Sequence, residues 1–114
     1  MREIRFYRTP SGHSPVEEFL DSLPGKTAQK IVWVLQLVEE LDVVPKNYLK
    51  KLAGTDDLWE IRIQIGNNSF RILGFFAGRS TIVLNHAFQK KTQKTPAKHI
   101  RLAESRKRDY LSKN

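Results

Sequence analysis

The 114-residue sequence contains no cysteine. This excludes a disulfide scaffold, a cysteine-ligated zinc site and a thiol nucleophile, and it suits a reducing cytoplasm. No segment approaches the ~20 consecutive apolar residues that a membrane-spanning helix needs. The charged start, MREIRFYRTP, is too poor in apolar residues for a signal peptide. We therefore expect a cytoplasmic protein that does not contact a membrane.

Several enzyme signatures are missing as well. The sequence has no glycine-rich phosphate loop and no G-x-S-x-G motif, and its three histidines lack the spacing of metal ligands. We therefore expect neither a metal nor a cofactor. Internal repeats, low-complexity segments and linkers are also absent, so residues 1–114 are expected to form one domain with a modest core.

Positive charge is concentrated in the last quarter of the chain. The formal net charge is +8. Residues 1–85 are nearly balanced, whereas residues 86–114 combine nine basic residues with two acidic ones, giving +7. A local positive field favours a polyanionic partner such as a nucleic acid. The alternative is a basic helix that only keeps the protein soluble.

Hydrophobic periodicity predicts an α+β fold. Alternating residues indicate short strands, and apolar residues at i, i+3, i+4 and i+7 from Ile31 indicate a helix. We expect a small antiparallel sheet of about four strands, with a helical hairpin on one face and a basic C-terminal helix; Trp33 and Trp59 are assigned to the core. The other face is expected to be open. The predicted strands are 2–8, 58–65, 69–77 and 80–88, the helices are 15–23, 26–42 and 96–111, and 46–57 is a polar connector.

Two arginines flank the predicted hairpin turn at residues 66–68. Counting outward from the turn, Arg62 and Arg71 can be neighbours on one sheet face. Such a pair repels unless an anion lies between the two side chains, and arginine's planar fork suits phosphate oxygens. The alternative is that each arginine pairs with an acid such as Glu60 or Asp57.

Further candidates lie after the last predicted strand. Lys90, Lys91 and Lys94 belong to a basic loop that can add charge beside a phosphate, or that can simply be solvated. His86 titrates near neutral pH and is a candidate proton carrier, although a lone strand histidine is often structural. RNA can be cut by attack of its own 2′-hydroxyl on the adjacent phosphorus, which requires orientation, charge stabilisation and two proton transfers.

Four segments together resemble one family. LWEIR at 58–62, SFRILGFF at 69–76, HAFQKKTQKTP at 86–96 and the opening FYRTPSGHSPVEEFLDSLP are similar to the HigB-like branch of the RelE/ParE toxin superfamily, including its phage-derived members. The resemblance spans nearly the whole chain. It implies a RelE-like microbial ribonuclease fold and a metal-independent endoribonuclease that cleaves mRNA on the ribosome and so inhibits translation. It also implies a monomeric free toxin that forms a hetero-oligomer with a cognate antitoxin.

The resemblance also suggests site residues. The family's basic positions are matched by Arg62, Arg71 and one or both of Lys90 and Lys91, with Lys94 nearby. Where relatives carry a strand lysine this chain has Glu60, and Tyr110 is expected to be a packing residue. Two other functions share these features: inhibition of DNA gyrase, as in ParE-type members, and non-catalytic nucleic-acid binding. For RNA or ribosome binding we expect the helix residues Lys98, Arg101, Arg106 and Arg108.

Overall fold

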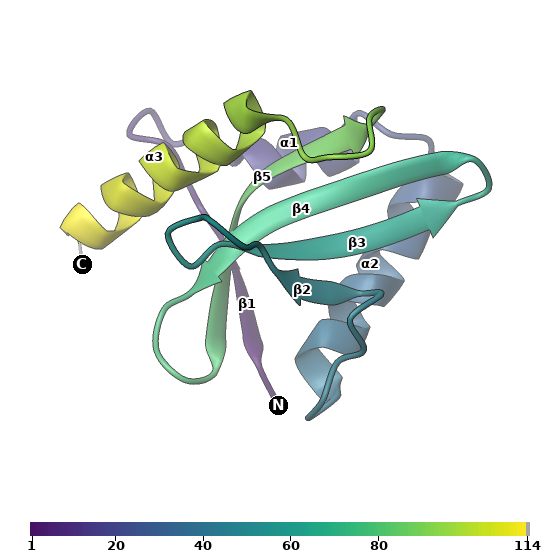
Figure 1. Ribbon diagram of the computed structural model, residues 1–114, viewed down its shortest axis with the longest axis horizontal. Coiled ribbons are helices and arrows are strands. Elements are labelled where there is room, and N and C mark those ends of the chain that lie inside the picture. Colours follow the sequence, from purple (N-terminus) through teal and green to yellow (C-terminus); the bar gives the residue numbers. More distant parts are fainter. Residues whose placement is uncertain (114) are drawn as a thin grey trace.

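The computed structural model describes residues 1–113 and arranges them as one five-stranded sheet with three helices (Figure 1). Each predicted helix and strand is found close to its expected position. The structure corrects the expected strand count from about four to five. In chain order the elements are β1 (Glu3–Phe6), α1 (Pro15–Asp21), α2 (Gly25–Glu40), β2 (Leu49–Lys51), β3 (Trp59–Ile65), β4 (Asn68–Phe76), β5 (Thr81–Lys90) and α3 (Ala97–Lys113).

The strands follow the spatial order β1-β5-β4-β3-β2. The three central strands form the antiparallel meander that their short turns predict. β1 pairs in parallel with β5 at one edge, and β2 pairs antiparallel with β3 at the other. β2 is the additional strand, and it lies in the segment expected to be a connector.

Helices α1 and α2 cover one face of the sheet and enclose the main core. Ile31, Val34 and Val38 of α2 are fully buried and belong to the same cluster as Ile61 and Ile72 of the sheet. Burying each such side chain contributes about 1.5–3 kcal/mol relative to exposure. No helix within residues 1–113 is long and apolar enough to cross a membrane.

The expectation that Trp33 belongs to the core is wrong. Its side chain is 44 % exposed and packs edge-on against Tyr48, with the Lys30 ammonium 4.6 Å from its ring centre. Trp33 lies beside the buried stripe of α2 and not within it. Trp59 is partly buried against the main core, where it contacts Phe76.

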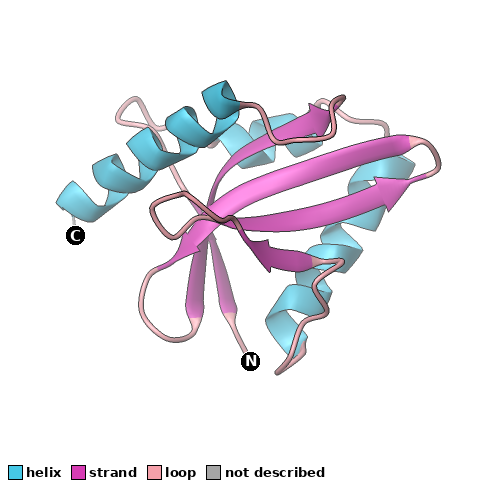
Figure 2. Ribbon diagram, in the orientation of Figure 1, coloured by secondary structure: helices cyan, strands magenta, loops and turns pink. Residues whose placement is uncertain are grey.

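Helix α3 packs on the opposite face, but only over one end of it (Figure 2). Ala103 of α3 is buried with Leu73 and Phe88, and Tyr110 packs on Phe75. The buried Lys107 also faces the protein and donates to the Asp56 carbonyl. The face expected to be open is therefore half covered, and the end that carries the β3–β4 turn is free.

An irregularity in the β4–β5 pairing orients two polar residues toward α3. Leu73 pairs with His86 and Gly74 pairs with Leu84, so Asn85 is an extra residue in β5. The Asn85 amide donates to the Ala103 carbonyl at 2.9 Å, and the His86 ring contacts Arg106. Gly74 is required here because a Cβ atom would lie 2.3 Å from the Val83 carbonyl oxygen.

Candidate functional site

A hollow of about 670 Å³ opens on the free end of this second face. Its walls come from the β3–β4 hairpin, the end of β5 and the loop that follows. Among residues 1–113, no acidic side chain lines it. We call it the basin; its lining residues are Arg62, Asn67, Asn68, Ser69, Arg71, Gln89, Lys90, Lys91, Thr92 and Gln93.

The two arginines lie directly opposite each other. Arg62 on β3 and Arg71 on β4 are register partners, whereas the count from the turn predicts only near neighbours; the pairing is direct because Ile65 pairs with Asn68, which belongs to β4 and not to the turn. Lys90 pairs with Ser69, one step along the same face. Arg71 is only 6 % exposed, whereas the Arg62 side chain is 35 % exposed. The sheet therefore fixes one guanidinium in the floor of the basin and leaves the other near its rim.

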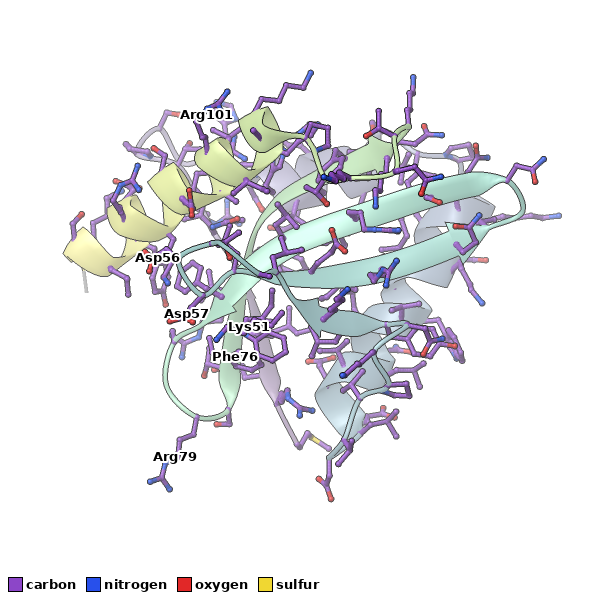
Figure 3. The ribbon with its side chains drawn as sticks, in the orientation of Figure 1. Lys51, Asp56, Asp57, Phe76, Arg79 and Arg101 are labelled. Atoms are coloured by element: carbon purple, nitrogen blue, oxygen red, sulfur yellow. The ribbon has the colours of Figure 1, made fainter. Side chains whose placement is uncertain are left out.

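A single buried carboxylate lies beside both arginines. Glu60 is 3 % exposed, and its Oε1 atom lies 3.4 Å from Arg71 Nε and 3.6 Å from Arg62 Nε. Its Oε2 atom accepts a hydrogen bond from Thr95 Oγ1 at 2.8 Å. Of the two acids considered as partners, Glu60 takes this role, whereas Asp57 pairs with Lys51 at 2.9 Å (Figure 3).

Glu60 does not neutralise the basin. Four basic side chains line it, so one carboxylate leaves a formal charge of +3. Burial lowers the pKa of Arg71, and Arg62 lowers it further, against the opposing effect of Glu60. Burial and the nearby Arg71 likewise lower the pKa of Lys90. An anion in the basin would relieve this repulsion, which makes the basin suited to a phosphate.

Comparisons with known proteins place these residues in a family. Residues 18–108 match the model of the family described as phage-derived protein Gp49-like. The chain belongs to the Gp49-like family. Two curated relatives, both named probable endoribonuclease HigB1, come from two strains of Mycobacterium tuberculosis. Each is 32 % identical to this chain over 106 residues, which cover 91 % of this chain and 81 % of the relative. The resemblance to HigB-like toxins is thereby confirmed.

Not every candidate of this Gp49-like chain reaches the basin. Arg62, Arg71, Lys90 and Lys91 line it together, whereas Lys94 is exposed in the following loop and is not among the lining residues. His86 lies away from the basin, beneath α3, where burial, His99 and Arg106 lower its pKa to about 4. His86 is therefore neutral near pH 7 and faces other side chains.

The basic helix residues also divide into two groups. Lys98, Arg101 and Arg108 are exposed and are called the outer cations of α3; Figure 3 shows Arg101 on the side of the helix away from the sheet. Arg106 points inward, donating to the Asn85 carbonyl at 2.9 Å and lying 3.1 Å from His86 Nδ1. Arg106 thus anchors α3 to β5.

Sequence reasoning missed one basic residue on this face. Lys50 of β2 is the register partner of Glu60 and contributes to lowering the pKa of Lys90. The apolar Leu49 next to the polar Lys50 is the pattern of a half-buried strand. A segment of three residues is too short for this pattern to predict a strand. Among residues 1–113, no group of three or more histidine, aspartate or glutamate side chains could hold a metal ion.

Proposed function

We propose that this protein is the toxin of a type II toxin–antitoxin pair and acts as an endoribonuclease that cleaves mRNA on the ribosome. The observation that carries the proposal is the register pairing of Arg62 with Arg71 in a basin whose walls hold four basic side chains and no acid. The Gp49-like family and the relatives named HigB1 support the same activity.

The two arginines would bind the scissile phosphate. Arg71, fixed in the floor, and Arg62, at the rim, each offer donors to the phosphate oxygens, and their charge stabilises the dianionic transition state. Glu60 would hold both guanidinium groups in orientation through its Oε1 atom, while Thr95 fixes its other oxygen. Lys91 adds positive charge from the loop.

Proton transfer would involve Lys90 in place of the more distant His86. The lowered pKa of Lys90 makes its ammonium a stronger acid, suited to protonating the departing 5′-oxygen. The ribose 2′-hydroxyl attacks the phosphorus and gives up its proton to solvent water, while the bond to the 5′-oxygen breaks and that oxygen takes the proton of Lys90. The products are a 2′,3′-cyclic phosphate and a 5′-hydroxyl. In this scheme basic side chains supply all of the charge stabilisation, so no metal is needed.

Primer extension on mRNA in a translating extract, with and without ribosomes, tests the target. We expect cleavage only with ribosomes, and mass spectrometry should identify cyclic-phosphate ends. A 5′-phosphate end would contradict attack by the 2′-hydroxyl. Intact mRNA together with loss of DNA gyrase activity would instead assign the protein to the gyrase inhibitors.

We also propose that a cognate antitoxin neutralises the toxin. The basin and the outer cations of α3 present positive charge that an acidic segment complements, and such complementarity raises association rates. We expect the free toxin to be monomeric and the pair to form a hetero-oligomer in the cytoplasm. Pull-down from the native cell should recover a small acidic protein, and its absence would contradict this partner.

A further inference from the structure

A second cleft adjoins the basin at the start of α3. It encloses about 220 Å³, roughly seven times the ~30 Å³ that one water molecule occupies in the liquid. Unlike the basin, it has ring side chains in its wall, contributed by Phe88, Pro96 and His99. It shares Gln89, Lys90, Lys91 and Thr92 with the basin. A nucleotide whose phosphate lies in the basin can therefore place its base in this ring-lined cleft.

The rings of the cleft are fixed by stacking between β5 and α3. His99 lies parallel to Phe88, with 3.8 Å between ring centres and 4° between planes. The His86 ring packs against the same phenylalanine, with 5.5 Å between the ring centres. Phe88 is 6 % exposed and belongs to the cluster beneath α3. The position of His99 is therefore set by packing as well as by hydrogen bonds.

A chain of hydrogen bonds determines which nitrogen of His99 carries the proton. The Arg106 guanidinium only donates, so His86 Nδ1, 3.1 Å from it, must accept. The proton of neutral His86 is then on Nε2, which donates to His99 Nδ1 at 2.7 Å. The proton of neutral His99 is consequently on its own Nε2 atom.

Both histidines stay neutral near pH 7. The pKa of His86 is lowered to about 4 by burial, His99 and Arg106, and the pKa of His99 is lowered by burial and Lys98. Within residues 1–113 the His99 Nε2 atom has no hydrogen-bond partner. The hydrogen bonds from Arg106 through His86 thus leave the His99 Nε2–H group without an acceptor among the described residues. His99 is one of the residues that line the cleft.

We infer that this cleft binds the nucleobase next to the phosphate held in the basin, and that His99 Nε2–H helps to select that base. The inference rests on the proposed RNA cleavage. Every base presents ring nitrogens or carbonyl oxygens as acceptors, but at different positions on its edge. Single-stranded RNA is commonly recognised by such edge contacts beside aromatic rings. His99 would be a specificity residue, whereas Arg62 and Arg71 bind any nucleotide through its phosphate.

NMR titration of the isotopically labelled free protein tests the inference without ribosomes. The probes are ribose 5-phosphate and the four ribonucleoside 5′-monophosphates. We expect ribose 5-phosphate to shift only signals of the basin, including Arg62 and Arg71. The nucleotides should in addition shift the His99 ring signals, and the four affinities should differ. One hydrogen bond contributes about 0.5–1.5 kcal/mol, so the affinities of the strongest and weakest nucleotides should differ by roughly two- to tenfold.

Three variants distinguish a loss of base selection from a loss of protein folding. His99→Phe retains a ring to stack on Phe88 but loses the donor, so the nucleotides should bind with nearly equal affinity. His99→Gln supplies an amide donor of similar reach and should restore part of the spread, even if the phenylalanine variant folds poorly. Arg62→Ala should weaken the binding of ribose 5-phosphate and of all nucleotides alike, leaving the ratios unchanged.

Two results would overturn the inference: nucleotides that shift only the basin, or an unchanged affinity spread in His99→Phe. The failure of the proposed cleavage is distinguishable. If Arg62→Ala and Arg71→Ala cleave mRNA normally while His99 still discriminates between nucleotides, the cleavage mechanism is wrong and the base cleft stands. If none of the five probes shifts either the basin or the cleft, both proposals fail.

Discussion

Replacing Arg71 with alanine removes the guanidinium that the sheet fixes in the floor of the basin. Loss of one preorganised donor to a charged transition state lowers a reaction rate by roughly 10²–10³. We expect the Arg71→Ala variant to lose mRNA cleavage by this factor. Arg71→Lys should recover only part of the rate, because an ammonium lacks the planar fork that contacts two phosphate oxygens.

The same substitution also affects stability, because Arg71 and Glu60 are 6 % and 3 % exposed. Removing one partner of a buried ion pair costs about 3–5 kcal/mol when the other charge is left alone. Glu60 keeps Arg62 at 3.6 Å and the hydroxyl of Thr95 at 2.8 Å. We therefore expect a smaller loss, about 1–3 kcal/mol, which lowers the melting temperature by roughly 3–6 °C per kcal/mol in a chain of this size.

A double variant separates the two effects. Glu60→Gln with Arg71→Ala removes the buried charge that has lost its buried partner, so calorimetry should show the melting temperature returning toward wild type while single-turnover cleavage stays low. Arg62→Ala is the matched control, because its side chain is 35 % exposed and its loss should reduce cleavage with little change in stability. Full cleavage by Arg71→Ala, or cleavage that recovers with stability in the double variant, would show that the arginine is structural.

Three further outcomes are expected. Replacing the outer cations of α3 by glutamine should weaken ribosome association and reduce the slope of log affinity against log salt by up to about 3, as fewer counterions are released, and an unchanged slope would mean a merely solvated face. Gly74→Ala should destabilise the fold, measured by urea unfolding, because its Cβ would lie 2.3 Å from the Val83 carbonyl oxygen; unchanged stability would contradict that contact. The pKa of His86 falls from 6.5 to about 4 on folding, so the unfolded chain binds more protons between these values and stability should rise with pH across this window. His86→Phe should flatten that rise, and an equal slope in both proteins would mean that another group is responsible.

Residues whose positions depend on nearby sequence, such as a turn or a helical repeat, could be predicted from the sequence. The turn at Gly66 limits the β3–β4 register, so counting from it was sufficient to predict that Arg62 and Arg71 are near neighbours, although not that they pair directly. The periodicity of α2 likewise identified Ile31 and Val34 as core residues. A two-residue turn and a helical repeat each act over a few residues, and such patterns are readable from the chain alone.

The rest depends on contacts between distant segments. Neither the burial of Glu60 beside both arginines nor its bond to Thr95 can be read from spacing, since 35 residues separate Glu60 from Thr95. The extra residue Asn85 turns His86 toward α3, and no turn signal marks that position. Lys107 belongs to the basic C-terminal helix, yet its ammonium donates a hydrogen bond to the carbonyl of Asp56, 51 residues earlier in the chain. In each case tertiary packing decides where a polar side chain lies.

The parallel pairing of β1 with β5 has a consequence for the order of folding. Glu3 pairs with Thr81, 78 residues later in the chain, and within residues 1–113 β1 has no other strand beside it. Contacts of such high sequence separation slow folding, since a long loop must close before they form. We therefore expect the β1 edge to form after the β3–β4 and β4–β5 hairpins, whose strands are neighbours in the sequence. The sheet that carries the basin can then be in place before its parallel edge strand is added.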